Sequence, residues 1–225
     1  MKPAPATAKA EETRLRILRA AIELFRNQGF DQTTMREIAG EAGVAIGAAY
    51  YYFASKEAMV MGFYELASGE MAPLIASALA APGRLEAKLR ALIEVKFRYF
   101  EPNRAFLGAL LRHAADPHHP LSPFSEETRA IREADIASFA RALEEGEVRV
   151  PKDLAAHLPG LLWLYQMGLI FFWLADRSPG QVRTARLTGR SLHLLVNLLK
   201  LAGLPLMRPL RRTVLELIEI AQQRA

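Results

Sequence analysis

The chain of 225 residues contains no cysteine. Disulfides, thiolate nucleophiles, cysteine-ligated metals and thiol redox sensors are therefore excluded, and we expect a reducing, cytoplasmic compartment. Strand signals are scarce as well, because the sequence has no long alternating β-branched run and no Asn-Gly hairpin turn. A fold built on β-sheets is thus disfavoured.

The sequence also lacks a strong excess of one charge sign. Lys and Arg number 29 against 24 Asp and Glu, which gives a formal net charge of +5. Residues 1–60 hold eight basic and seven acidic side chains, so the surplus is not concentrated there. With 51% apolar and 24% charged residues, the composition is that of a folded protein. Net charge leans only mildly toward an anionic partner.

The amino-terminal segment MKPAPATAKAEETRLR has no apolar run that could serve as a signal peptide. We expect residues 1–10 to form a disordered Ala/Pro tail. The one long uncharged run has 22 residues, from Leu154 to Ala175, and is long enough to span a bilayer. Pro159, Gly160, Gln166 and Gly168 interrupt it. We favour a helix buried in a bundle or subunit interface and expect no membrane partner, while a membrane-anchored protein remains an alternative.

Helical periodicity covers nearly the whole chain, with Gly, Pro and Ser at the breaks. The pattern predicts an all-α fold of about ten helices, at residues 11–28, 34–42, 45–52, 55–80, 83–100, 103–114, 124–145, 153–175, 179–201 and 206–223. Short helices and tight turns give way to long apolar helices after Ser55. We therefore expect a small domain at 11–56 and a helical bundle at 57–225.

The most informative stretch runs from Thr33 to Glu57. Thr34 and Glu37 have the spacing of a capping box at a helix start, and Gly43 supplies the left-handed residue of a sharp turn. Ala49 and Phe53, four residues apart, can point back into one small core. The pattern predicts a helix-turn-helix whose second helix could enter a DNA major groove, although a plain helical hairpin shows the same spacing.

Three consecutive tyrosines, Tyr50, Tyr51 and Tyr52, stand on that second helix. At about 100° per residue they cannot all be buried in one small core. Together with Lys56, their hydroxyl groups suit contact with phosphates. Packing of the rings within a bundle is the alternative interpretation.

The stretches ILRAAIELFRNQGFDQTT, REIAGEAGV and YYYFASKEAMV, between about Thr13 and Val60, resemble the DNA-binding domain of the tetracycline-repressor (TetR) family. The resemblance implies a homodimeric regulator with three amino-terminal helices for DNA and a carboxy-terminal bundle for ligand and dimerisation. It also implies a palindromic double-stranded operator and a small apolar effector that releases it. An all-α small-molecule or lipid carrier without DNA binding is the alternative from another class.

Carried over by position, the resemblance assigns Thr34 to phosphate and Arg36 to a phosphate or base edge. It places the start of the second helix in the groove and the later tyrosines and Lys56 on the backbone. The implied DNA-binding residues are Thr34, Arg36, Ala45, Ile46, Gly47, Ala48, Tyr50, Tyr51, Tyr52 and Lys56. The family commonly has hydroxyl residues where Ala45 and Ala48 stand and a polar or cationic residue at Ile46. Base readout would therefore depend on Arg36, Tyr50 and contacts with thymine methyl groups, or on DNA shape.

Catalytic and metal-binding patterns are weak, and we expect no enzyme activity, metal or cofactor. His118 and His119 near Asp116 lack helical ligand spacing, and no nucleophile elbow or Gly-rich phosphate loop is present. The bundle is rich in large apolar residues, most of which could be packing. Since the family bundle encloses an effector, we expect an apolar pocket between about residues 95 and 175, with candidate residues Phe97, Phe100, Phe106, His113, Phe124, Trp163 and Met167.

We expect the homodimer to form through the helices at 153–175 and 179–201. The second of these helices carries two apolar stripes, Leu187, Leu194, Leu195 and Leu198 on one and Leu192, Val196 and Leu199 on the other. One stripe can face the chain's own bundle and the other a partner. Periodicity alone does not tell them apart.

Overall fold

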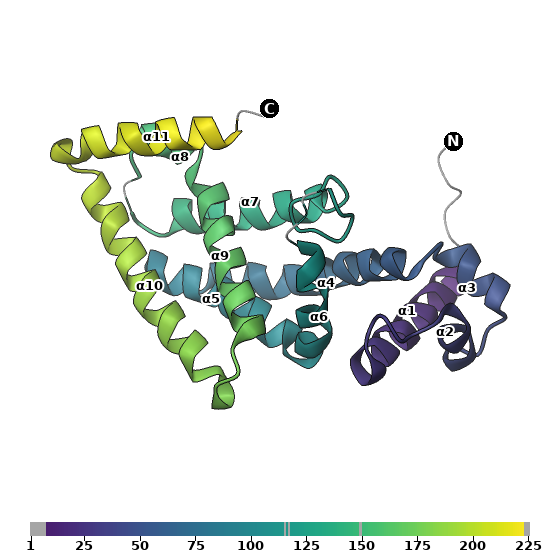
Figure 1. Ribbon diagram of the computed structural model, residues 1–225. Helices are drawn as coiled ribbons and strands as arrows, with labels where there is room; N and C mark the ends of the chain where they lie inside the picture. Colours follow the sequence, from purple (N-terminus) through teal and green to yellow (C-terminus); the bar gives the residue numbers. More distant parts are fainter. Residues whose placement is uncertain (1–7, 115, 117, 149, 223–225) are drawn as a thin grey trace. The chain divides into compact units, whose positions relative to one another are not determined.

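The computed structural model describes residues 8–114, 116, 118–148 and 150–222 (Figure 1). Within these residues every regular element is helical, which confirms the all-α prediction. The α-helices are α1 (Ala8–Gln28), α2 (Met35–Glu41), α3 (Ile46–Tyr52), α4 (Lys56–Ala80), α5 (Leu85–Phe100), α6 (Arg104–Ala114), α7 (Arg129–Glu145), α8 (Lys152–Ala155), α9 (Leu158–Ala175), α10 (Val182–Ala202) and α11 (Arg208–Gln222). Short 3-10 turns stand at η1 (Glu101–Asn103), η2 (Pro179–Gln181) and η3 (Pro205–Met207).

Most helix boundaries differ from the sequence prediction by one to three residues, and three differences have a clear physical reason. α1 begins at Ala8, so residues 8–10 of the expected tail are helical, in keeping with the high helix propensity of Ala and Lys. α7 begins only at Arg129, because Ser125 and Thr128 bind neighbouring backbone groups and hold the chain in turns before it. The expected helix 153–175 is divided into α8 and α9, and Pro159 stands in the first turn of α9.

The chain forms two compact units, which are described separately. The first unit contains the described residues up to Glu70 together with Tyr99–Arg132, and the second contains Met71–Arg98 with the described residues from Glu133 onward. The segment that carries α6 therefore belongs with the amino-terminal helices. The expected division between residues 56 and 57 is a functional one, and it stays a prediction.

An aromatic cluster occupies the core of the first unit. The rings of Phe25 and Phe106 are stacked with centroids 5.2 Å apart, and Phe30 lies 5.2 Å from Phe25. Arg26 Nε donates to Asn103 Oδ1 over 2.7 Å, and Asn103 is buried. α6 and η1 are thus fixed to α1 by a ring stack and a partly buried hydrogen bond.

The core of the second unit contains a buried ion pair. Lys96 Nζ of α5 lies 2.7 Å from both carboxylate oxygens of Asp135 on α7. Phe97 stacks on Trp173 of α9 with ring centroids 5.3 Å apart. α9 is the one helix among the described residues that is long and apolar enough to cross a membrane, and a third of its residues are buried within the fold.

Candidate nucleic-acid interface

The capping box at the start of α2 is confirmed. Glu37 N donates to Thr34 Oγ1 over 3.2 Å, and Thr34 N donates to Glu37 Oε2 over 2.7 Å. The Thr34 backbone and hydroxyl hydrogen bonds lower the pKa of the Glu37 carboxyl below its ordinary value. The ionised Glu37 carboxyl therefore stabilises α2. This stabilisation is fully present above the pKa that Glu37 has in the unfolded chain, and it is lost as the pH falls through its lowered pKa in the folded chain.

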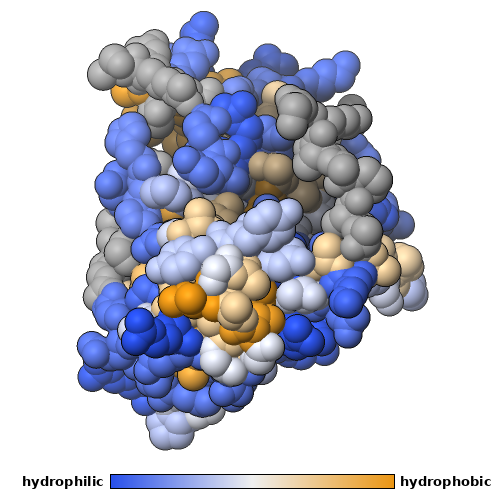
Figure 2. Space-filling view, turned by 90° about the vertical axis from the view of Figure 1, so that its right-hand side faces the viewer, coloured by the Kyte–Doolittle hydropathy of each residue, from blue (hydrophilic) through white to orange (hydrophobic). Residues whose placement is uncertain are grey.

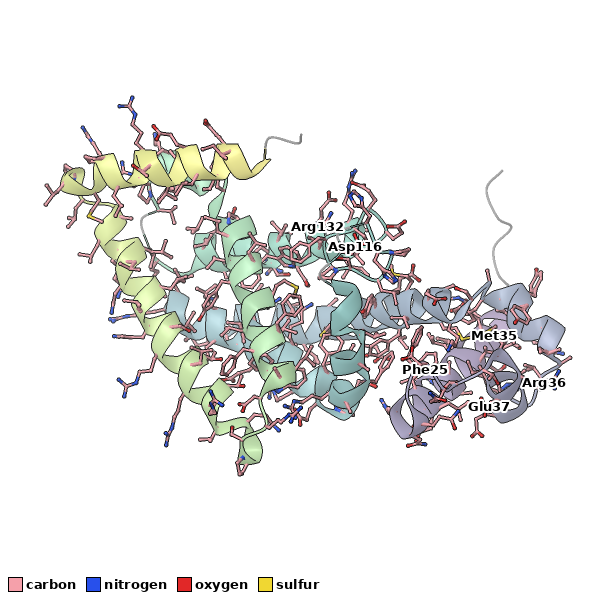
Figure 3. All side chains as sticks on the ribbon, viewed as in Figure 1. Phe25, Met35, Arg36, Glu37, Asp116 and Arg132 are labelled. Carbon is pink, nitrogen blue, oxygen red and sulfur yellow. The ribbon has the colours of Figure 1, made fainter. Side chains whose placement is uncertain are left out.

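The two faces of α2 differ in burial: one packs into the core and the other is exposed. Met35, Ile38 and Ala39 are buried in the core of the first unit. Arg36 is exposed on the other side, and Figure 3 shows it pointing away from Met35 and Phe25. The guanidinium of Arg36 therefore faces outward, while the buried face of α2 packs against the core and holds the helix in place.

A sharp turn at Gly43 connects α2 to α3. Gly43 has a φ of +63°, a left-handed conformation that costs little only for glycine. Val44 N donates to Ala39 O over 2.9 Å and closes the turn. The turn fixes the direction in which α3 leaves the core.

α3 divides its residues between the core and the surface. Ala49 and Phe53 are almost completely buried. Other residues of α3 reach the surface, since Ile46 is 44% exposed, Tyr50 51% and Tyr51 83%. Figure 2 views this end of the molecule and shows an apolar patch bordered by hydrophilic surface. The amino-terminal part of the face is completed by Ala45, Gly47 and Ala48, of which Ala48 is half-buried.

Gly47 leaves the backbone of α3 uncovered by a side chain at this position. A Cβ atom at Gly47 would meet nothing within 4 Å, so packing within the chain does not require glycine here. Glycine inside a helix costs about 0.5–1 kcal/mol relative to alanine. Its absence of a side chain allows another surface to approach the α3 backbone closely.

Lys56 and Tyr52, which the family resemblance assigns to the DNA backbone, both make contacts within the chain. Lys56 Nζ donates to Phe30 O over 2.6 Å and to Asp31 O over 3.3 Å, and lies 4.7 Å from the centre of the Phe30 ring. Tyr52 is half-buried and packs edge to face against Tyr51. An ammonium group has three donors, so at most one of those on Lys56 remains for a phosphate. No local sequence pattern indicates this contact of Lys56 with Phe30 and Asp31, which lie about 25 positions earlier in the chain.

The expected effector residues are divided between the two units. Phe97, Trp163 and Met167 belong to the second unit. Phe106 is 2% exposed in the core of the first unit, Phe100 packs against that core, and Phe124 is exposed. The side chain of His113 lies outside the described residues. Among the described residues, no group of three or more His, Cys, Asp or Glu could hold a metal ion.

The arrangement on α2 and α3 has counterparts in known proteins. A family profile described as "Bacterial regulatory proteins, tetR family" matches residues 17–61. A second, "Tetracyclin repressor-like, C-terminal domain", matches residues 88–217. The two profiles cover both the helix-turn-helix and most of the remaining helices.

Curated relatives are transcription regulators. The regulator YerO of Bacillus subtilis is 28% identical over 169 residues, covering 71% of this chain and 57% of that protein. The repressor KstR2 of Rhodococcus jostii is 38% identical over 93 residues, covering 39% of this chain and 46% of that protein. The chain thus spans about half the length of these relatives.

Solved structures share the fold. FadR of Bacillus subtilis, crystallised in complex with stearoyl-CoA, has a TM-score of 0.61 at 20% identity, over 81% of this chain and 97% of that one. GusR of Salmonella enterica has a TM-score of 0.62 at 23% identity, over 88% of this chain and 100% of that one.

Proposed function

Because the chain belongs to the tetracycline-repressor family of bacterial transcription regulators, we propose that it is a repressor that occupies a palindromic operator and is released by an effector with a large apolar part. The family is one of helix-turn-helix DNA-binding regulators rather than enzymes. The observation that carries the proposal is the exposed face of α3, held by a capped α2 and the Gly43 turn. Family membership also implies a cytoplasmic location.

On this proposal α3 enters the major groove with its amino-terminal residues toward the base edges. Ile46 and Ala48 can contact thymine methyl groups, and Gly47 lets the backbone come close to the bases. Arg36 and Tyr50 supply the hydrogen-bonding groups, and Tyr51 reaches a phosphate. Since few side chains here can form paired hydrogen bonds with a base, DNA shape contributes to sequence preference.

We propose that the protein acts as a homodimer. The stripe of Leu192, Val196 and Leu199 is buried in the chain's own core. The outward apolar residues include Leu164 on α9 and Leu187, Leu194, Leu198 and Leu201 on α10. α11 adds exposed apolar residues that the sequence analysis did not consider, among them Leu210, Leu217 and Ile220. A self-complementary contact around a two-fold axis would cover these side chains and set two recognition helices side by side.

Leu198→Arg is expected to give a folded monomer with lost operator affinity. Leu198 is 51% exposed in the single chain, so the substitution spares the core. In the dimer the charge would be buried without a partner, which costs several kcal/mol, roughly 3–5. Sedimentation velocity at micromolar concentration measures the change, with Ala105→Arg on the surface of α6 as control. A wild-type chain that sediments as a monomer would contradict the homodimer.

The bundle supports an effector that has an apolar part and a hydrogen-bonding group. Phe97, Trp163 and Met167 provide apolar surface in the second unit. Gln166 Nε2 and Thr188 Oγ1 are buried and have no hydrogen-bond partner among the described residues. Buried unpaired polar atoms are rare, and an acceptor on a ligand would satisfy the Gln166 amide. The structural relative bound to stearoyl-CoA makes acyl thioesters the first class to test.

An effector of this kind is expected to raise the melting temperature and to release the operator. A ligand can shift the equilibrium only if it binds the DNA-free state more tightly, and operator must weaken ligand binding by the same factor. We would titrate stearoyl-CoA and shorter acyl-CoAs into the protein–DNA complex and follow fluorescence anisotropy. Gln166→Leu should weaken release and leave DNA affinity unchanged. Ligands that raise the melting temperature but never affect DNA binding would argue against an effector site.

A further inference from the structure

A surface groove of about 430 Å³ lies on the second unit between the start of α5 and the middle of α10. Glu86 lines it from α5, and Ala185, Arg186, Gly189, Arg190 and His193 line it from α10. Figure 3 shows nitrogen-tipped side chains along the outer edge of α10. The depression is wide open to solvent, so it would cover only part of a bound small molecule.

The single carboxylate in the lining is already neutralised. Glu86 Oε1 accepts a hydrogen bond from Arg90 Nη2 over 3.2 Å, and Glu86 Oε2 lies 3.1 Å from His193 Nδ1. Both contacts engage Glu86 with groups inside the unit. The Glu86 carboxylate is therefore paired with Arg90 and His193, and it does not offset the charges of Arg186 and Arg190.

Arg186 and Arg190 have no such partner. Both side chains are exposed, and no carboxylate among the described residues pairs with either guanidinium. They stand four residues apart on one helix, where like charges destabilise the helix by about 0.2–0.5 kcal/mol. An anion bound between them would remove this repulsion.

Gly189 lies between the two arginines in the middle of α10. A Cβ atom there would come no closer than 3.8 Å to another group, the Arg90 Nη1 atom, so packing does not require glycine. Glycine inside a helix is less stable than alanine by about 1 kcal/mol. Its presence leaves the groove open down to the helix backbone.

We propose that this groove, the Arg186–Arg190 groove, binds the phosphate group of a small molecule. Each of the two guanidinium groups can donate a pair of hydrogen bonds to phosphate oxygens. Arginine has this planar donor geometry and lysine does not. The small set of lining residues and the paired Glu86 at the edge favour a compact phosphate ester over an extended charged surface. All residues that line the groove lie on α5 and α10, and none lies on α2 or α3.

The test is calorimetric titration of the full chain with inorganic pyrophosphate at constant ionic strength. We expect one site per chain, and at least about a tenfold loss of affinity in Arg186→Gln and in Arg190→Gln, as for a lost charged hydrogen-bonding pair. Arg186→Lys should retain only part of the affinity. Arg212→Gln on α11 removes the same charge elsewhere and should bind as the wild type does. Gly189→Ala should stabilise the chain toward urea and still weaken pyrophosphate.

Three results would overturn the proposal. One is a wild-type chain that binds pyrophosphate no better than it binds chloride. Another is equal weakening by Arg186→Gln and Arg212→Gln, which would indicate a diffuse charge effect. The third is sedimentation with vesicles that contain phosphatidic acid in the absence of measurable pyrophosphate binding, because that would assign the arginines to a lipid surface. Circular dichroism of each variant shows that the helices remain folded.

Discussion

Ile46→Glu is expected to reduce affinity for the operator by roughly 100-fold, since a like charge facing phosphates costs several kcal/mol. Ile46 is the first residue of α3 and is 44% exposed, so no core contact depends on it. An acidic residue in the first turn of a helix is favourable by about 0.3–1 kcal/mol. The variant should therefore fold at least as well as the wild type while its DNA binding is lost.

Ile46→Lys is the matched control. It has a similar side-chain length and the opposite charge, and it should keep or increase DNA affinity while slightly destabilising the start of α3. Fluorescence anisotropy with labelled operator at fixed salt measures both variants, and thermal melting reports their stability. Equal affinities for the two variants would mean that α3 does not face DNA.

Asp135→Leu is expected to lower the free energy of unfolding by about 3–5 kcal/mol, the usual cost of removing one partner of a buried ion pair. Lys96 and Asp135 are only 6% and 9% exposed. Lys96 Nζ lies 2.7 Å from both Asp135 oxygens. Without Asp135 the ammonium group would stay buried with no opposite charge.

The double variant Lys96→Met with Asp135→Leu serves as its control, because an apolar pair of similar size is often neutral or stabilising. Urea unfolding followed by circular dichroism gives both free energies. The single variant should be far less stable than the double variant. If the two lose the same stability, the ion pair is not what holds α5 to α7.

Local signals allowed the sequence to predict the helix-turn-helix closely. The capping box of Thr34 and Glu37 and the turn at Gly43 depend on residues within ten positions of one another, and both were confirmed. The contact between Lys56 and the carbonyl oxygens of Phe30 and Asp31 joins residues about 25 apart. Nothing in the local pattern indicates such a contact.

Apolar residues in the remaining helices were harder to assign, because a ring in a core and a ring in a pocket have the same sequence pattern. Phe106 was a candidate effector residue, yet it stacks on Phe25 of α1. The two stripes of α10 were both visible in the sequence, and only packing showed that Leu192 is buried and Leu198 exposed. The Arg186–Arg190 groove depends on α5 as well as α10, so α10 alone could not reveal it.

Selection of bound duplex DNA from a random-sequence pool is the decisive test of whether the protein recognises a specific operator. We expect one enriched palindrome whose half-sites lie about one helical turn apart or a multiple of it, ~34 Å per turn. Affinity for that palindrome should fall steeply with salt, as phosphate contacts require. A pool in which no sequence is enriched, from a chain that is folded and still binds apolar ligands, would contradict the account and favour an all-α carrier.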